Sequence, residues 1–424
     1  MSRLSSKRLC SQINVSFRLF TRQSMTLRTT ERKHETIYAL SSGHGKCGVA
    51  VVRISGVNAS KALNKMTTIS NIEPRKAVLK KILDPETKEV IDNGLCLWFP
   101  GPKSFTGEDC VEFHVHGGPA ILTSLMNALS KLHFYQALPG EFTRRAFYNN
   151  KLDLVEIEGL ADLIEAETEQ QRKQALLQAN GHLSKLYKDW RKSLINIISN
   201  LEAYIDFNEE DNIEDNVLEI CNCSINDLIK RIEQHLSDNR KVQRNAAIVS
   251  PIAGTTRDII ELRINISGYP VILADTAGFT KSPKDPVESE EECRKRCIVV
   301  ANKIDLLNEK NKEIIKKENL VATSFITEEG LLDITKIMTH YCKKLCRDTF
   351  NEDPVISQTR YRHHLYRCLN NLQNYIKIIS VENYDMVIAV EEIRIAMREL
   401  GMITGHVYND EILNNIFKNF CIGK

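Results

Sequence analysis

Residues 183–204, LSKLYKDWRKSLINIISNLEAY, decide how this chain is organised. Apolar side chains recur in this stretch at every third or fourth position: Leu183, Leu186, Trp190, Leu194, Ile197, Leu201 and Tyr204. That spacing places them along one side of a single long helix. Residues 217–236 predict a second helix, and residues 357–380, 387–400 and 410–420 show the same period. The chain therefore contains helices in two separate pieces.

A segment with a different pattern, residues 242–345, separates the two helical pieces. Strand-like runs occupy residues 259–266, 270–274 and 297–301, and a short turn follows the first of them. Because the two ends of a domain often lie close together, one domain can be inserted into another. We therefore expect a discontinuous helical domain with a second domain inserted into it.

The chain ahead of the helices, residues 36–150, alternates short strands with turns. The pattern predicts strands at residues 37–40, 48–54, 94–99 and 109–116, and a helix at residues 120–132. Such a mixture is typical of a compact α+β domain. The fold class expected for the whole chain is multi-domain α+β.

The first thirty residues contain no Asp or Glu, six Lys or Arg, and many Ser and Thr. Apolar residues recur among them at helical spacing: Leu4, Leu9, Ile13, Phe17 and Phe20. A basic amphipathic segment of this kind is typical of a mitochondrial transit peptide, which we assign to residues 1–33. The alternative is a disordered basic tail of a cytosolic or nuclear protein.

Composition excludes several classes of protein. The chain has 424 residues, of which 42% are hydrophobic and 26% charged, which argues against a largely disordered or collagen-like chain. Its net charge is +2, so any contact with RNA must come from a local basic patch. No apolar run approaches the 18 residues of a membrane span. The twelve cysteines are scattered without a C-x-x-C pair, which favours free thiols in a reducing compartment such as the mitochondrial matrix.

Three short motifs in the inserted segment point to a guanine nucleotide. They are Gly254-Thr255-Thr256-Arg257-Asp258, Asp275-Thr276-Ala277-Gly278 and Asn302-Lys303-Ile304-Asp305. Thr256 is suited to Mg²⁺ and the γ-phosphate, and Asp275 to the Mg²⁺ shell, with the Gly278 amide on the γ-phosphate. Asp305 is suited to accept the guanine N–H protons, with Asn302 supporting its loop. The predicted GTP-binding set is Thr256, Asp275, Thr276, Ala277, Gly278, Asn302, Lys303 and Asp305.

The phosphate loop that should precede these motifs is missing. A working GTPase carries G-x-x-x-x-G-K-S/T, whose backbone N–H groups and lysine hold the phosphates. The nearest imitation, residues 43–49, lacks the lysine after its last glycine and lies in the N-terminal domain. Residues 241–249 leave no room for a strand, a phosphate loop and a helix ahead of Gly254.

A second gap follows the Asp275 motif. Residues 278–302 have room for one strand, where a G domain has a helix, a strand and another helix. We therefore expect a truncated Ras-like α/β sheet without its first and fourth strands, whose remaining third and fifth strands lose their usual pairing partners. Such a chain would not bind GTP tightly. A splice variant or a faulty gene model accounts for the gaps better than a designed catalyst.

Several strings outside the insert carry a family resemblance. They are Ser104-Phe105-Thr106-Gly107-Glu108-Asp109, His116-Gly117-Gly118-Pro119, Pro139-Gly140-Glu141-Phe142-Thr143-Arg144-Arg145-Ala146-Phe147, Lys151-Leu152-Asp153-Leu154-Val155-Glu156, Ala161-Asp162-Leu163-Ile164 and Phe420-Cys421-Ile422-Gly423-Lys424. With them the chain resembles, over about residues 36–424, the tRNA modification GTPase family (MnmE/TrmE) and its animal mitochondrial member.

That resemblance implies a domain plan. A transit peptide (1–33) would precede an N-terminal folate-binding and dimerisation domain (34–150). A helical domain would follow in two parts, 151–241 and 349–424, with an incomplete TrmE-type G domain (242–348) between them.

The resemblance also implies a reaction. The N-terminal domain would bind a tetrahydrofolate derivative, the 5,10-methylene form, that supplies one carbon, and would form a homodimer. With an FAD-dependent partner protein, the family alkylates C5 of the wobble uridine in certain tRNAs. Hydrolysis of GTP with Mg²⁺, dependent on K⁺, drives the family's G domains together.

Individual site residues follow from the resemblance as well. The implied folate contacts are Arg53, Glu112, Lys151 and Lys424, and Cys421 matches the cysteine tied to the modification chemistry. The implied K⁺ ligands are Ser250, Ile252 and Thr255, and Thr256 would bind Mg²⁺. Glu288 matches the carboxylate that orients water, although residues 281–286 depart from the family pattern. Residues 324–326 depart from the second guanine loop.

Three hypotheses remain open from the sequence. The chain is a mitochondrial tRNA-modifying GTPase, a non-hydrolysing isoform that binds folate and partners, or a different P-loop regulator without a folate role. Two smaller features also stay open. The pair His114 and His116 suits packing better than metal binding, and the basic residues within 360–367 suit either tRNA phosphates or a solvated face.

Overall fold

The computed structural model describes residues 35–43, 45–68, 73–207, 216–237, 261–274, 298–308, 315, 320–346, 356–408, 410–418 and 420–423. The expected transit peptide lies outside these residues. Contacts divide the chain into two compact units, Met1–Ile157 with Tyr408–Lys424, and Glu158–Val407. We call them the first and the second unit and describe each by itself.

The first unit is built on a six-stranded sheet with the order β3-β4-β5-β2-β1-β6. Its strands are β1 (Ile37–Leu40), β2 (Cys47–Ser55), β3 (Val78–Leu83), β4 (Val90–Phe99), β5 (Cys110–Gly117) and β6 (Tyr135–Gln136). Neighbouring strands are antiparallel except β1 and β6, which are parallel. The predicted α+β character of residues 36–150 is therefore confirmed.

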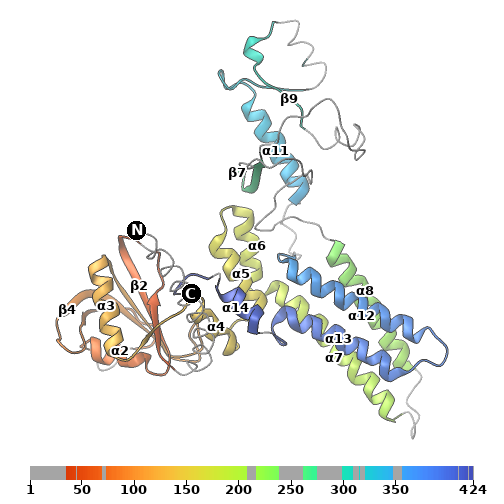
Figure 1. The fold of residues 1–424 in the computed structure, drawn as a ribbon, viewed down its shortest axis with the longest axis horizontal. Coiled ribbons are helices and arrows are strands. Elements are labelled where there is room, and N and C mark those ends of the chain that lie inside the picture. Colours follow the sequence, from red (N-terminus) through yellow and green to blue (C-terminus); the bar gives the residue numbers. More distant parts are fainter. Residues whose placement is uncertain are drawn as a thin grey trace, which may run out of the picture. The chain divides into compact units, whose positions relative to one another are not determined.

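One face of this sheet is covered by helices α2 (Ala59–Met66) and α3 (Pro119–Lys131), as Figure 1 shows. Alternate residues of β2 and β5, among them Val52 and Phe113, point into the core that these helices close. The residues between them must therefore point to the opposite face, where the candidate site lies.

Part of that opposite face is closed by α4 (Glu141–Tyr148), against which α14 (Asp410–Lys418) packs. Phe142 of α4 packs with Ile37, Ala39 and Phe105 in a second, smaller apolar cluster. The α4–α14 approach is close, because a Cβ atom on Gly140 (φ +68°) would lie 2.4 Å from the carbonyl oxygen of Phe417. Glycine at this position therefore lets the two segments meet.

The unit boundaries differ from the domain plan expected from the sequence. Residues 408–424 belong to the first unit, although the plan grouped them with helices 349–407. The physical reason is aromatic packing: Phe417 lies 6.5 Å from Phe147 and 6.3 Å from Phe420, measured between ring centroids. Burial of these rings holds the end of the chain on the first unit.

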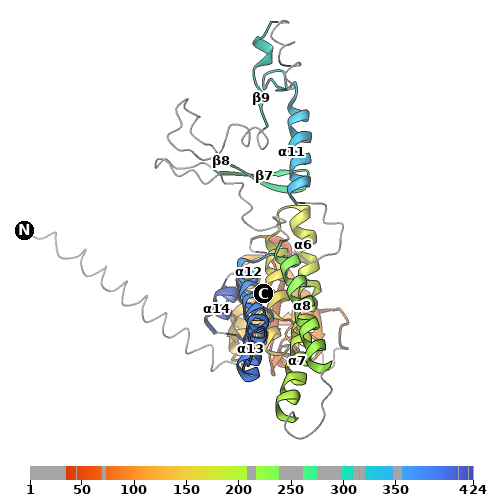
Figure 2. The same ribbon diagram turned by 90° about the vertical axis from the view of Figure 1, so that its right-hand side faces the viewer.

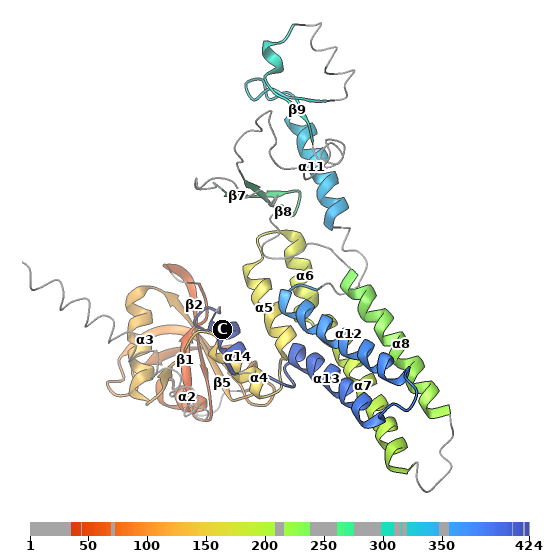
Figure 3. The same ribbon diagram turned by 45° about the vertical axis from the view of Figure 1, so that its right-hand side comes forward.

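The second unit contains a bundle of α7 (His182–Phe207), α8 (Asn216–Ser237), α12 (Thr359–Ile379) and α13 (Met386–Thr404), which run alongside one another in Figures 2 and 3. Helix α5 (Leu154–Glu165) crosses the unit boundary, and α6 (Glu169–Ala179) follows it. The predicted stripe of α7 is buried at Leu183, Trp190, Leu194 and Leu201, so the long helix is confirmed.

The described part of the inserted segment forms two separate two-stranded sheets. Strands β7 (Glu261–Ile266) and β8 (Tyr269–Ala274) pair antiparallel, and β9 (Val300–Ala301) pairs parallel with β10 (Val321–Ala322) (Figure 2). A short 3-10 helix (Ile304–Leu306) and α11 (Leu331–Cys346) complete the described elements here. Within the described residues, β8 and β9 are thus in different sheets rather than one.

In the part of the chain that the structure describes, no helix has both the length and the apolar character needed to cross a membrane.

Candidate functional site

The centre of the candidate site is an ion pair on the sheet face opposite α2 and α3. Arg53 of β2 lies directly opposite Glu112 of β5 in the strand register. Its Nε donates to Glu112 Oε1 at 2.9 Å, and each side chain is 18% exposed. Pairs on neighbouring strands meet in this way because their Cβ atoms are only about 5 Å apart.

Two aromatic rings lie against the Arg53 guanidinium. Its central carbon is 5.2 Å from the ring centroid of Phe105 and 5.8 Å from that of Phe142. Phe105 comes from the loop between β4 and β5, and Phe142 from α4. A cation against aromatic faces gains electrostatic attraction, so the rings help to fix the position of the guanidinium.

Lys151 contacts the loop that carries Phe105. Its Nζ donates to the carbonyl oxygen of Pro102 at 3.1 Å, and the side chain is exposed. The structure therefore brings Arg53 and Glu112 into direct contact, and the Lys151 side chain lies against the loop that carries Phe105.

The C-terminal tail crosses the end of β1 next to this site. Ser41 Oγ donates to the carbonyl oxygen of Gly423 at 2.9 Å. Leu40 pairs with Val52, the residue next to Arg53, so the tail lies beside the same part of the sheet. Cys421 is an exposed free thiol on this tail, and Lys424 lies outside the described residues.

The two histidines of β5 have carboxylate partners. His114 Nε2 is 3.3 Å from Glu112 Oε2, and His116 Nδ1 is 2.9 Å from Asp92 Oδ1. Burial acts to raise the pKa of Asp92, but hydrogen bonds from His116 and from the Asn93 amide outweigh it and lower that pKa. Among the described residues, no three acidic, histidine or cysteine side chains gather as a metal site. Each of the two imidazoles thus has a carboxylate oxygen within hydrogen-bond distance.

The loop after β9 holds the described part of the predicted guanine site. Asn302 Oδ1 accepts from the Lys303 amide at 2.8 Å, and the Ile304 amide donates to the carbonyl oxygen of Thr323 at 3.1 Å. Ser324 Oγ donates to Asp305 Oδ1. Although residues 324–326 depart from the family pattern, Ser324 thus contacts the predicted guanine-binding carboxylate directly.

The remaining predicted nucleotide and cation residues lie outside the described residues. They are Ser250, Ile252, Thr255, Thr256, Asp275, Thr276, Ala277, Gly278 and Glu288.

Four basic residues of α12 have partners inside the second unit, although the Arg367 side chain is still 57% exposed. Arg360 donates to Glu158 at 2.9 Å, and Arg362 donates to the carbonyl oxygen of Leu236 at 2.9 Å. Arg367 and His364 both contact Glu399. The structure therefore favours a role in bundle packing over a free basic face.

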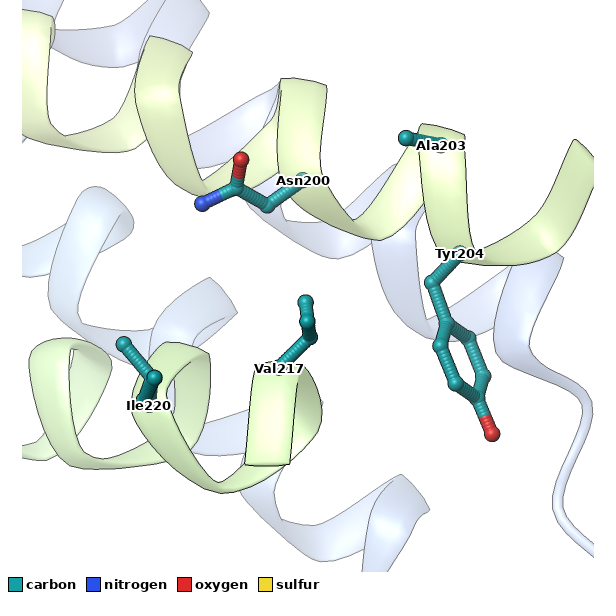
Figure 4. Close-up of a pocket in the computed structure, with 5 residues that line it drawn as sticks. All are labelled: Asn200, Ala203, Tyr204, Val217 and Ile220. Atoms are coloured by element: carbon teal, nitrogen blue, oxygen red, sulfur yellow. The ribbon is translucent and has the colours of Figure 1, made fainter. Parts of the chain in front are cut away.

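A hollow of about 200 Å³ lies between α7 and α8, lined by Asn200, Ala203, Tyr204, Val217 and Ile220 (Figure 4). None of these side chains is a carboxylate, imidazole, thiol or amine. This hollow therefore offers no acid, base or nucleophile beyond the Tyr204 hydroxyl.

Sequence reasoning did not assign roles to Phe105, Phe142, Glu108 and Arg145, which surround the pair. Two strings that carry the family resemblance contain all four residues. A signal was therefore present in the sequence, but it did not say which side chains face Arg53.

Comparisons with known proteins agree with this architecture. The family model described as GTP-binding protein TrmE N-terminus matches residues 36–151, and that of the MnmE helical domain matches residues 154–421. The chain is 40% identical to 5-taurinomethyluridine-[tRNA] synthase subunit GTPB3, mitochondrial, of Danio rerio over 471 positions, which cover 92% of this chain and 93% of that protein.

Bacterial relatives are equally similar. The chain is 41% identical to tRNA modification GTPase MnmE of Rickettsia bellii (strain RML369-C) over 452 positions, which cover 92% of this chain and 100% of that protein. It is 40% identical to tRNA modification GTPase MnmE of Wolbachia sp. subsp. Drosophila simulans (strain wRi) over 446 positions, covering 92% and 99%. These alignments are longer than the 424 residues of this chain, so each relative has positions without a counterpart here. The helical-domain model spans more than half of the chain, and the identities extend over nearly the whole of each relative, so this chain belongs to the MnmE/TrmE family of tRNA modification GTPases.

Proposed function

We propose that this chain binds a tetrahydrofolate derivative, in the 5,10-methylene form, at Arg53, Glu112 and Lys151. The proposed purpose is the modification of C5 of the wobble uridine in mitochondrial tRNAs. The observation that carries the proposal is the Arg53–Glu112 pair, joined at 2.9 Å with Phe105 and Phe142 against the guanidinium.

The side chains present fit the chemistry of a folate. A pterin ring has an edge of N–H donors and ring acceptors, which suits a carboxylate such as Glu112 beside an arginine. The negatively charged glutamate tail of a folate needs cations, and exposed Lys151 supplies one, with Lys424 proposed as another. When bound, the folate supplies the carbon unit, while the side chains of this chain bind and orient it.

We assign the modification chemistry itself to the C-terminal tail. Cys421 is exposed, and the bond from Ser41 to Gly423 fixes its tail on the first unit. A thiol in that position is accessible to a substrate held at the neighbouring sheet. We therefore propose Cys421 as the reactive thiol of this site.

The wider assembly is also part of the proposal. The name of the Danio rerio relative includes the words tRNA and mitochondrial, and its alignment covers 92% of this chain. We propose tRNA as the substrate, the mitochondrial matrix as the location, and a homodimer that works with an FAD-dependent partner protein.

We further propose that this chain is a non-hydrolysing form. Its sequence contains no G-x-x-x-x-G-K-S/T segment, and its relatives have positions for which it has no counterpart. Without that loop, Thr256, Asp275 and the proposed K⁺ ligands would have no phosphate-bound partner to act with. The Asp305 loop alone would contact only the guanine base.

Isothermal titration of the full chain with 5-formyltetrahydrofolate tests the folate proposal. We expect saturable binding that Arg53→Ala weakens at least tenfold and that Lys76→Ala leaves unchanged, because Lys76 is an exposed residue paired with Glu73. Equal affinities for all three proteins, or no binding by the wild-type chain, would reject the proposed site.

A GTP assay tests the second part. We expect the purified chain, with Mg²⁺ and K⁺ present, to hydrolyse GTP no faster than buffer and to retain no GTP on a filter. Turnover by this chain would show that another segment replaces the phosphate loop.

A further inference from the structure

We propose that Glu108 is a positioning residue that holds the two aromatic side chains against Arg53. This inference rests on the proposed folate function, because it assigns Glu108 a role at that same site.

Glu108 joins three segments of the first unit. Its Oε2 accepts from Ser55 Oγ at 2.7 Å and from Arg145 Nη1 at 2.9 Å. Ser55 ends β2, Arg145 belongs to α4, and Glu108 belongs to the loop between β4 and β5. The side chain of Glu108 is 20% exposed and that of Arg145 only 9%, so water competes weakly for these bonds.

Thr106 extends these contacts within the loop. Its Oγ1 lies 2.7 Å from Ser55 Oγ and accepts from the Glu108 amide at 3.2 Å, and its side chain is fully buried. The Thr106 carbonyl oxygen accepts from Asn149 Nδ2 at 2.7 Å. Thr106, which directly follows Phe105, is therefore fixed through both its side chain and its carbonyl group, and this limits how far Phe105 can move.

The same contacts reach both rings at Arg53. Phe105 is next to Thr106 in the loop, and Phe142 lies one helical turn before Arg145 on α4. Ser55 lies two residues after Arg53 on β2, so both point to the same face of the sheet. Glu108 thus bonds to the strand that carries Arg53 and to the helix that carries Phe142, from the loop that carries Phe105.

The negative charge of Glu108 strengthens its hydrogen bond with Arg145. Hydrogen bonds between a carboxylate and a guanidinium are about twice as strong as neutral ones. Glu108→Gln keeps the size and one acceptor oxygen but removes the charge that Arg145 meets. The loop and α4 would then be tied less firmly, and the rings would leave the guanidinium more often.

A double-mutant cycle tests the proposal. We expect Glu108→Gln to weaken binding of 5-formyltetrahydrofolate to the full chain about tenfold. In a Phe105→Ala background, the same change should weaken binding clearly less than tenfold, because one of the two rings that Glu108 positions is already gone. Glu73→Gln, at an exposed glutamate of the same unit, serves as the control and should leave affinity unchanged.

Hydrogen exchange supplies a readout that does not need folate. The peptide covering residues 100–110 should exchange faster in Glu108→Gln than in the wild-type chain, and Ser55→Ala should give a smaller change in the same direction. If wild-type chain binds no folate, the proposed function fails, whereas exchange still decides whether Glu108 holds the loop.

Two results would overturn the inference. One is unchanged exchange in residues 100–110 of folded Glu108→Gln. The other is a cycle in which the effects of Glu108→Gln and Phe105→Ala simply multiply. Should Glu108→Gln fail to fold, Ser55→Ala replaces it in the cycle, with the same criteria.

Discussion

Glu112 is shared between two partners, Arg53 on one oxygen and His114 on the other. A carboxylate in this position balances the positive charge of the arginine. Replacing Glu112 by glutamine removes the negative charge that balances Arg53 but keeps the size of the side chain. Substitutions of single side chains at this site therefore give predictions that can be tested separately.

Glu112→Gln should weaken binding of 5-formyltetrahydrofolate about tenfold, because an amide accepts pterin donors less strongly than a carboxylate. Titration calorimetry measures the change, and urea unfolding should show that Glu112→Gln costs less stability than Glu112→Ala, because the amide keeps the size and hydrogen bonding of the side chain. A Glu112→Gln protein with wild-type affinity would argue against direct contact between Glu112 and the ligand.

The lowered pKa of His364 predicts how the free energy of unfolding depends on pH. Burial lowers the pKa of His364 below its ordinary 6.5, opposed by the hydrogen bond that its Nδ1 donates to Glu399, and Arg360 and His363 also disfavour its cation. The unfolded chain therefore binds more protons below pH 6.5 than the folded chain. The free energy of unfolding should fall as pH drops from 6.5 toward the lowered pKa, by at most about 1.4 kcal/mol per pH unit.

Urea unfolding at pH 7.5 and 5.5 checks this sign. His364→Gln should lose part of the pH dependence, whereas His340→Gln, at an exposed histidine of α11, should keep it. An identical slope in all three proteins would mean that His364 does not contribute.

The C-terminal tail, as an element, depends on one backbone conformation. Gly423 has φ +96°, and a Cβ atom there would lie 2.0 Å from the carbonyl oxygen of Leu40. No side chain fits this space without moving the backbone. The tail that carries Cys421 can therefore lie this close to β1 only because residue 423 has no side chain.

Gly423→Ala should release the tail from β1. Hydrogen exchange in residues 410–424 should accelerate at least tenfold, and folate affinity should fall if Lys424 is one of its contacts. Gly43→Ala is the matched control, because a Cβ atom at Gly43 meets nothing within 4 Å. Equal exchange in both variants would contradict this account of the tail.

The elements themselves were largely predictable, and the site was not. The strand at residues 37–40 and the helix expected at 120–132 follow from local alternation and period, and the structure has them at Ile37–Leu40 and Pro119–Lys131. Arg53 and Glu112 were named by resemblance, but their contact depends on which strands are neighbours. Local patterns carry no information on that order, because it is set by packing of the whole sheet.

The contacts of Glu108 were unpredictable for the same reason. Glu108 contacts Arg145, which is 37 positions later in the sequence, and Ser55, which is 53 positions earlier. Only the folded loop brings these residues together. Ser324 was expected to depart from the family pattern, yet its hydroxyl contacts Asp305. A residue that departs from the family pattern therefore still makes a direct contact with the predicted guanine-binding carboxylate.

Across the second unit, a buried ion pair joins helices that are distant in sequence. Arg360 donates two bonds to Glu158 and further bonds to the carbonyl oxygens of Met402 and Ile403, and Tyr361 also donates to Glu158. Burial raises the pKa of Tyr361 well above its ordinary value, so the hydroxyl stays protonated and can donate. This cluster ties α5, α12 and α13 together.

Glu158→Ala should destabilise the second unit by about 3–5 kcal/mol, because it leaves Arg360 as a buried charge without its carboxylate. Urea unfolding followed by circular dichroism measures the loss. Asp227→Ala, which breaks an exposed pair with Arg231 on α8, should cost less than about 1 kcal/mol. Similar losses in the two variants would contradict the importance of burial here.

For the molecule as a whole, we propose that the folate site is retained although the phosphate loop is missing. A crystal of the full chain soaked with 5-formyltetrahydrofolate tests this most directly. We predict density for the pterin within hydrogen-bond distance of Glu112 and Arg53. A well-ordered crystal in which that face of the sheet stays empty at saturating ligand would contradict the account.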